Sequence, residues 1–128
     1  MRVRIVAEVK PTEDQRKVLA AVSRLFPEVR FEVRERGGSV EVCGESDQLS
    51  SLKYLKENLR RRKVRAAAER IIRSYSGTGY VRMVLSKQAA YVGTVSFLEE
   101  DEIPEIGWID VYVETEDPEG LIGWLTER

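Results

Sequence analysis

The chain has 128 residues, 42% hydrophobic and 34% charged, which is typical of a globular domain and excludes a disordered chain. Its formal net charge of −1 conceals a split, because residues 1–90 contain 20 Lys and Arg against 11 Asp and Glu, whereas residues 91–128 contain one Arg against 11 Asp and Glu. The two parts therefore carry +9 and −10. This asymmetry indicates an anion-binding half, with neutralisation inside the fold or across a dimer as the alternative.

No apolar run approaches the roughly 20 residues of a membrane-spanning helix, so we expect no membrane contact. The N-terminus alternates like a strand and has no apolar signal-peptide region. The single cysteine excludes an internal disulfide and favours a reducing, cytoplasmic compartment. Scarce Asn and Gln among many charged residues are typical of a thermophile protein.

The first half of the chain predicts a strand, a helix and a hairpin. Val3 to Val9 alternate apolar with mostly polar residues, as a strand with one buried face does. A capping box of Thr12 and Gln15 begins a helix that ends before Pro27. Alternating residues on either side of Gly37-Gly38 predict a β-hairpin.

Two helices should follow, joined by a basic segment. Leucines from Leu49 to Leu59 form one apolar stripe, and Val64 to Tyr75 form a second at helical spacing. The gap of five residues from Leu59 to Val64 breaks the helical phase, so we expect a sharp kink or two helices. The second helix should bury four residues against a sheet, namely Ala67, Ala68, Ile71 and Ile72.

The remaining elements are strands and one last helix. Strands are predicted over residues 80–85, 91–98 and 108–114, with Ser86-Lys87-Gln88 as a polar connection. Asp117 followed by Pro118 predicts the start of the last helix. The order is β-α-β-β-α-α-β-β-β-α. Short connections favour one α+β domain over residues 1–128, with helices packed on a mostly antiparallel sheet.

The residues of common catalytic sites are missing. The chain has no histidine, which removes the commonest general base and metal ligand, and Cys43 has no histidine to activate it. The acidic run at residues 99–102 lacks the alternating ligands of a calcium loop and is interpreted as a solvated loop. Aromatic residues are assigned to core or interface rather than to base stacking: Trp108, Tyr112 and Trp124. We therefore expect a non-enzymatic protein without a cofactor.

The strongest candidate site is the junction of the two helices, which we call the basic corner. It consists of five cations: Arg60, Arg61, Arg62, Lys63 and Arg65. Arginine presents forked donors that match phosphate oxygens, and a cluster of cations attracts a polyanion strongly. The alternative is a solvated helix face.

Several segments together resemble a known family. They are VRIVAEVKPTED at the N-terminus, the GG hairpin, and LSKQAAYVGTVSF followed by an acidic loop and IDVYVETEDPEGLIGWL. This pattern is similar to an archaeal family of small uncharacterised proteins described as RNA-binding. The resemblance implies the fold of the ribosomal protein that binds 5S rRNA, a cytoplasmic homodimer, and RNA, ribosomal or otherwise structured, as partner. It also adds Lys87 and Gln88 to the candidate RNA-binding residues, as members of the motif.

The leading hypothesis is a non-enzymatic RNA-binding protein that contacts phosphates through the basic corner. The alternative is an assembly module whose basic and acidic halves meet across a homodimer or with another protein. A homodimer would use strand edges or the segment 91–97 as contacts.

Overall fold

A computed structural model describes residues 1–127 and confirms the α+β class. The strands are β1 (Arg2–Val9), β2 (Phe31–Arg36), β3 (Ser39–Ser46), β4 (Tyr80–Ser86) and β5 (Trp108–Glu114). The α-helices are α1 (Gln15–Leu25), α2 (Lys53–Arg62), α3 (Arg65–Tyr75), α4 (Lys87–Tyr91) and α5 (Pro118–Leu125). Two short 3-10 helices cover Leu49–Leu52 and Glu100–Glu102.

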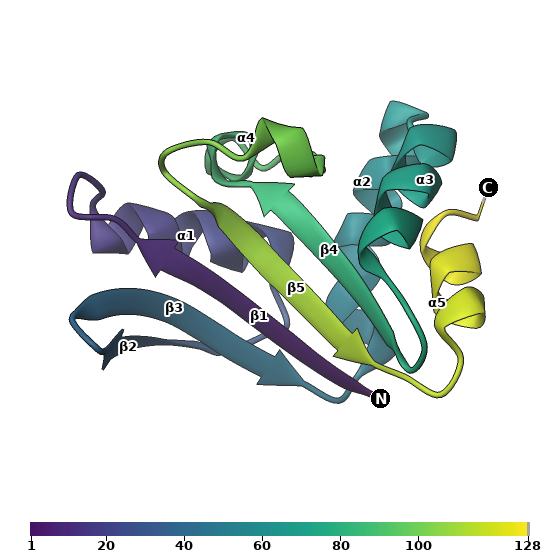
Figure 1. Cartoon of the computed structure of the whole chain (residues 1–128), viewed down its shortest axis with the longest axis horizontal. Helices are drawn as coiled ribbons and strands as arrows, with labels where there is room; N and C mark the ends of the chain where they lie inside the picture. Colours follow the sequence, from purple (N-terminus) through teal and green to yellow (C-terminus); the bar gives the residue numbers. More distant parts are fainter. Residues whose placement is uncertain (128) are drawn as a thin grey trace.

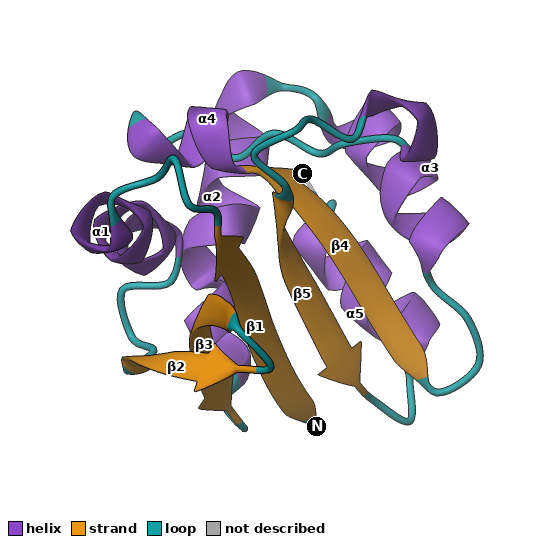
Figure 2. Ribbon diagram, turned by 60° about the vertical axis from the view of Figure 1, so that its left-hand side comes forward, coloured by secondary structure: helices purple, strands orange, loops and turns teal. Residues whose placement is uncertain are grey.

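The five strands form one antiparallel sheet in the order β2-β3-β1-β5-β4. Alternation along β1 places Val3, Ile5 and Ala7 on the inner face, where all three are fully buried. Helices α1, α2 and α5 cover this face, and Figure 1 looks onto the opposite face, with α1 and α2 behind the strands. Figure 2 shows α3 beside β4. The outer face of the sheet is therefore left uncovered.

The β4 edge of the sheet is closed by other parts of the chain. Ser86 donates its N–H to the Ser96 carbonyl over 2.8 Å, and Leu98 donates to the Val84 carbonyl over 2.8 Å. Lower on the strand, the Arg82 N–H donates to the Ser76 hydroxyl over 3.1 Å. The free edge is β2, a strand of only six residues.

The strand predicted over residues 91–98 is wrong. Ser86 Oγ accepts from the Ala89 N–H and caps helix α4, which takes the chain to Tyr91. Of the predicted strand, only Phe97 forms a bridge, with Leu85. The alternation of residues 91–98 resembles a strand, but the cap at Ser86 directs the chain into a helix first.

The predicted break between two helices is confirmed. Lys63 adopts a left-handed conformation with φ of 55°, which ends α2 and redirects the chain into α3. The predicted buried set of α3 is only half right, because Ala68 and Ile72 are buried whereas Ala67 is exposed and Ile71 half-buried. Helix α3 contacts the sheet mainly along β4, so its buried stripe is narrower than the apolar pattern suggests.

Of the predicted caps of α1 and α5, the cap of α5 is confirmed and that of α1 is not. Asp117 Oδ1 accepts from the Gly120 N–H over 2.9 Å and caps α5, as predicted. Helix α1 is capped by Asp14, which accepts from the Arg16 N–H over 2.8 Å, and not by the predicted capping box at Thr12.

Candidate nucleic-acid interface

The basic corner lies at the end of α2 and the start of α3. Arg60, Arg61 and Lys63 are exposed, and Arg65 is half-buried. Within residues 1–127, none of these four side chains forms an ion pair or a side-chain hydrogen bond. The structure places these four cations at one helix junction, and residues 1–127 provide them with no carboxylate partner.

Arg62 differs from its neighbours. Its guanidinium donates to the backbone carbonyl of Val95, in the loop that follows α4. The N–H of Val95 in turn donates to Asn58 Oδ1 over 3.2 Å. Arg62 thus fixes this loop against α2, and its guanidinium is already engaged in a hydrogen bond within the chain.

A hollow lies beside the basic corner. It is lined by Leu59, Arg60, Lys63, Arg65, Ala66 and Glu127. The first N–H groups of any helix lack intrahelical acceptors, and Val64, at the N-cap of α3, supplies no side-chain acceptor for them. The single carboxylate in the lining is Glu127, which pairs with Lys56 Nζ at 3.0 Å. The hollow is therefore bordered by cations and by the positive end of a helix dipole.

Lys87 is not available to a nucleic acid. Its side chain is 1% exposed, and its ammonium donates to Glu13 Oε1 over 2.8 Å, to the Ile106 carbonyl over 2.5 Å and to the Glu8 carbonyl. The prediction that Lys87 contacts RNA is therefore corrected, because a buried and fully bonded ammonium cannot reach a phosphate. Gln88 is exposed on α4, which packs mainly against α1 and not at the basic corner.

Glu13 is the centre of this buried network. Burial alone would raise the pKa of the Glu13 carboxyl, but hydrogen bonds from Lys87, the Lys10 N–H and the Tyr91 hydroxyl together bring that pKa below its ordinary value. Burial, together with the hydrogen bond to Glu13, raises the pKa of Tyr91 to about 12. The motif that includes Lys87 and Tyr91 therefore serves the interior of the fold.

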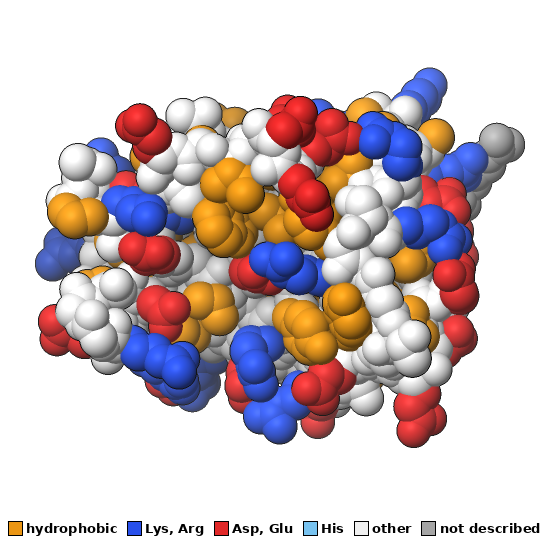
Figure 3. Space-filling model, in the orientation of Figure 1, with side chains coloured by type: hydrophobic (Ala, Val, Ile, Leu, Met, Phe, Trp, Pro, Cys, Tyr) orange, Lys and Arg blue, Asp and Glu red, His pale blue; other side chains and the backbone are white. Residues whose placement is uncertain are grey.

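The outer face of the sheet, which we call the open sheet face, is a second candidate surface that the sequence did not assign. Aromatic side chains stand on it half-buried: Tyr80, Trp108 and Tyr112. The rings of Tyr80 and Tyr112 stack with centroids 5.3 Å apart at 15°. Figure 3 shows this face, with hydrophobic side chains among both blue and red ones. The alternation of residues 108–114 was the available signal, since one set of side chains must face away from the core.

The charges on the open sheet face are balanced. The strands contribute five cations, Arg2, Arg4, Arg34, Arg36 and Arg82, and six carboxylates, Glu8, Glu32, Glu41, Glu45, Asp110 and Glu114. Several pair directly, including Arg2 with Glu45 at 2.8 Å and Arg82 with Asp110 at 2.7 Å. In contrast to the basic corner, this face offers little net attraction to a polyanion.

The split in charge along the chain is partly neutralised inside the fold. Four ion pairs join the basic and acidic parts: Lys56–Glu127 at 3.0 Å, Arg70–Glu99 at 2.6 Å, Arg73–Glu119 at 2.7 Å and Arg82–Asp110 at 2.7 Å. They lie along α2, α3 and β4, and they stop short of the basic corner. Internal neutralisation thus accounts for part of the charge split, and within residues 1–127 it does not reach this corner.

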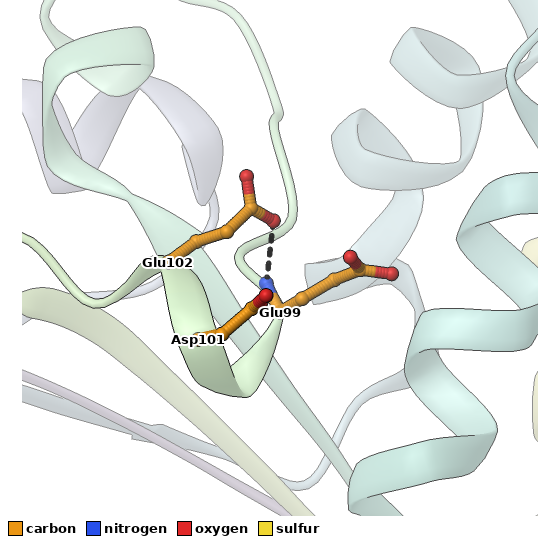
Figure 4. A group of neighbouring side chains, drawn as sticks. All are labelled: Glu99, Asp101 and Glu102. Carbon is orange, nitrogen blue, oxygen red and sulfur yellow. Dashed lines mark hydrogen bonds between the residues drawn. The ribbon is translucent and has the colours of Figure 1, made fainter.

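The acidic run forms a cluster of Glu99, Asp101 and Glu102 (Figure 4). Glu102 Oε1 accepts from the Glu99 N–H over 3.0 Å as part of a capping box, and the Glu99 carboxylate pairs with Arg70. Two of the three carboxylates are therefore used by the protein itself, and residues Glu100–Glu102 form a short 3-10 helix where the sequence predicted a loop.

These features describe a small α+β domain with one uncovered sheet face and an exposed cationic helix junction. Residues 2–115 match a family model described as RNA binding. The chain belongs to the archaeal UPF0201 family, which confirms the resemblance to an archaeal family described as RNA-binding.

Relatives of similar length support this assignment. The chain is 37% identical to a UPF0201 protein of Methanothermobacter thermautotrophicus and 34% identical to one of Sulfurisphaera tokodaii, each over 124 residues. These matches cover 97% of this chain and 89% and 86% of the relatives. The crystal structure of a UPF0201 protein from Methanococcus jannaschii is similar with a TM-score of 0.83 and 30% identity, covering 100% of this chain and 94% of that one. None of the helices described in residues 1–127 is both long and apolar enough to span a membrane.

Proposed function

We propose that this protein binds RNA, without an enzymatic reaction, by contacting backbone phosphates with the basic corner. The observation that carries the proposal is that Arg60, Arg61, Lys63 and Arg65 have no carboxylate partner within residues 1–127, whereas Arg70 and Arg73 of α3 and Arg82 of β4 do. Membership of a family described as RNA binding supports the same polyanion as ligand.

Electrostatics explain why a phosphate would be favoured here. Adjacent cations repel one another, and an anion placed between them removes this repulsion while gaining attraction to each. The guanidinium groups of Arg60 and Arg61 can each donate two parallel hydrogen bonds to one phosphate. Phosphate contacts carry no sequence information, so binding should depend strongly on salt and weakly on sequence.

The assembly alternative is less favoured. It requires the acidic half to cover the basic half of another molecule, yet four carboxylates of residues 91–127 already pair with cations of the same chain: Glu99, Asp110, Glu119 and Glu127. Within the described residues 1–127, no carboxylate pairs with Arg60, Arg61, Lys63 or Arg65.

The test compares salt dependence of RNA binding in a corner variant and the parent. In the variant, Arg60, Arg61 and Lys63 are changed to Gln, while Arg62 is kept because it holds Val95. Each lost single-strand phosphate contact lowers the slope of log affinity against log salt by about 0.7, so three should lower it by about two. Fluorescence anisotropy with an unstructured labelled oligonucleotide measures this slope.

A matched control removes the same charge elsewhere. Arg16, Lys17 and Lys53 are exposed and have no ion pair within residues 1–127. Changing these three to Gln should leave the slope near that of the parent. If the folded corner variant binds as tightly as the parent with an unchanged slope, the basic corner is not the RNA site.

A further inference from the structure

The hollow beside the basic corner differs in charge from two hollows on the open sheet face. Three cations line it, Arg60, Lys63 and Arg65, against one carboxylate, Glu127, which gives a net charge of +2. The hollow above β2 and β3 has four arginines against three glutamates, or +1, and the hollow above β4 and β5 has two arginines against three carboxylates, or −1. Of these three hollows, the one beside the basic corner therefore attracts an anion most strongly.

The one carboxylate of this hollow already has a cation of its own. Helix α5 packs against α2 and α3, which brings Glu127 to the hollow (Figure 1). Lys56 Nζ lies 3.0 Å from Glu127 Oε1 and 4.8 Å from the centre of the Trp124 ring, and it donates to the Trp124 carbonyl. The Lys56 side chain is only 15% exposed, so these contacts fix it in place. Because Lys56 neutralises Glu127, the three cations that line the hollow remain for a ligand.

The shape of the hollow selects among the phosphates of an RNA strand. Its volume of about 450 Å³ is within the range of small-ligand sites, and its apolar lining consists of Leu59 and Ala66. An internal phosphate carries a nucleoside on both sides, so the strand must pass across the mouth of the hollow. A terminal phosphate carries a nucleoside on one side only and can enter the hollow end-on. Arg61 is exposed but does not line the hollow, so it is placed for a phosphate outside it.

A terminal phosphate also carries more charge than an internal one. A phosphate monoester carries a charge of about −1.5 to −2 near neutral pH, whereas a phosphodiester carries a single negative charge. The attraction to each cation grows with the charge of the ligand, and apolar walls reduce the screening by water. We propose that the hollow binds the terminal phosphate monoester of an RNA strand, while Arg61 contacts a phosphate further along that strand. This inference rests on the proposed function and narrows its ligand to strands that end in a phosphate.

The first experiment compares the ends of the RNA. Three unlabelled RNAs of one short, unstructured sequence compete with a labelled oligonucleotide for the protein: one has a phosphate at the 5′ end, one has a phosphate at the 3′ end, and one has hydroxyls at both ends. At least one phosphorylated strand should bind about tenfold more tightly than the hydroxyl strand, which is what one further charge-assisted hydrogen bond contributes. The strand that gains affinity shows which end enters the hollow.

Two matched variants locate this preference. Ala66→Glu places a carboxylate in the hollow, and Ala67→Glu places the same charge at the next residue of α3, which is also exposed but does not line the hollow. Both positions lie in the first turn of α3, where a carboxylate stabilises a helix, so both variants should fold, and circular dichroism checks this. The preference for a terminal phosphate should disappear in Ala66→Glu and remain in Ala67→Glu, although the change in total charge is the same.

Two results would overturn this inference. One is equal binding of all three strands by the parent. The other is a preference that the two variants leave unchanged or reduce to the same extent, because it would then come from another surface or from the total charge. If the three strands bind equally while the salt slope still falls in the corner variant, the terminal-phosphate inference fails and the proposed function stands. An unchanged slope in the corner variant overturns the proposed function itself.

Discussion

The basic corner and the open sheet face are both rich in arginine, yet they differ in what surrounds it. On the sheet, register places carboxylates beside the arginines, as with Arg4 between Glu45 and Tyr112, so the charges cancel locally. At the corner, Arg60, Arg61 and Lys63 lie within four consecutive residues at a helix end, where no neighbouring strand within residues 1–127 supplies a carboxylate. The comparison teaches that the partners of an arginine, more than the number of arginines, determine what a surface attracts.

The largest loss of stability is expected at the buried ion pair between Lys87 and Glu13. Changing Lys87 to Met removes the ammonium and leaves the Glu13 carboxylate, 6% exposed, without its ion-pair partner. Removing one member of a buried pair costs about 3–5 kcal/mol in the free energy of unfolding. Urea denaturation of both proteins measures the difference.

Lys10→Met is the matched control for that change. Lys10 pairs with Glu8 at 3.3 Å on the surface, where a pair contributes about 0–1 kcal/mol. Equal losses of unfolding free energy in the two variants would contradict the idea that burial determines how much the Lys87–Glu13 pair contributes to stability.

Acid should weaken the same buried pair. Because the folded pKa of Glu13 lies below the unfolded value, its stabilisation is complete above the ordinary glutamate range and is lost as pH falls through the folded pKa. The difference in unfolding free energy between the parent and Glu13→Gln should therefore shrink from about pH 7 to about pH 3. A difference that stays constant over this range would show that Glu13 contributes through packing and not through its charge.

A smaller effect is expected on the open sheet face. The Arg82 side chain is 34% exposed and pairs with Asp110, which is 29% exposed. The hydrogen bond to Asp110 raises the pKa of Arg82, which thus stays charged. Arg82→Gln should cost about 1 kcal/mol after screening by water. A double-mutant cycle with Asp110→Asn isolates the coupling energy of the pair. A coupling energy of zero would show that the opposite charges on this face balance in number but do not stabilise one another.

The smallest effect on stability is expected at the basic corner. Changing Arg60, Arg61 and Lys63 to Gln removes repulsion and no pairing within residues 1–127, so the unfolding free energy should stay within about 0.5 kcal/mol of the parent or rise slightly. Thermal melts at low and high salt should show a larger salt dependence in the parent. A clear loss of stability would mean that these cations have structural partners after all.

The sequence predicted the architecture well where one periodicity dominates. Local patterns predicted the hairpin at Gly37-Gly38, the strand that ends at Glu114 and the helix capped by Asp117. The strand predicted over residues 91–98 was wrong because its alternation competes with the helix cap at Ser86. Whether a cap forms depends on the geometry of a single residue. The burial of Ile71 was overestimated because a helix pattern does not show how wide a surface the helix will meet.

For the candidate site, the sequence located the cations but not their partners. Arg60 and Arg61 have no carboxylate partner within residues 1–127, whereas Arg70 pairs with Glu99, and that pair joins residues 29 positions apart in the chain. Lys87 was counted among the candidate RNA-binding residues as a member of the family motif, and its burial depends on a contact with Glu13, 74 positions away. The open sheet face required the strand order, which places β1 between β3 and β5.

That strand order has a consequence for how the protein is made. Of the five strands, β1 is synthesised first, and one of its two neighbours in the sheet is β5. Arg2 can therefore pair with Glu114 only after nearly the whole chain has been synthesised. The hairpin β2–β3 and its pairing with β1 can form early, whereas closing β1 against β5 joins the two ends of the chain and carries a large loop-closure entropy. A nascent chain that stops before β5 exposes one side of β1 as an unpaired edge, and we expect such truncated chains to aggregate until the last strand is added.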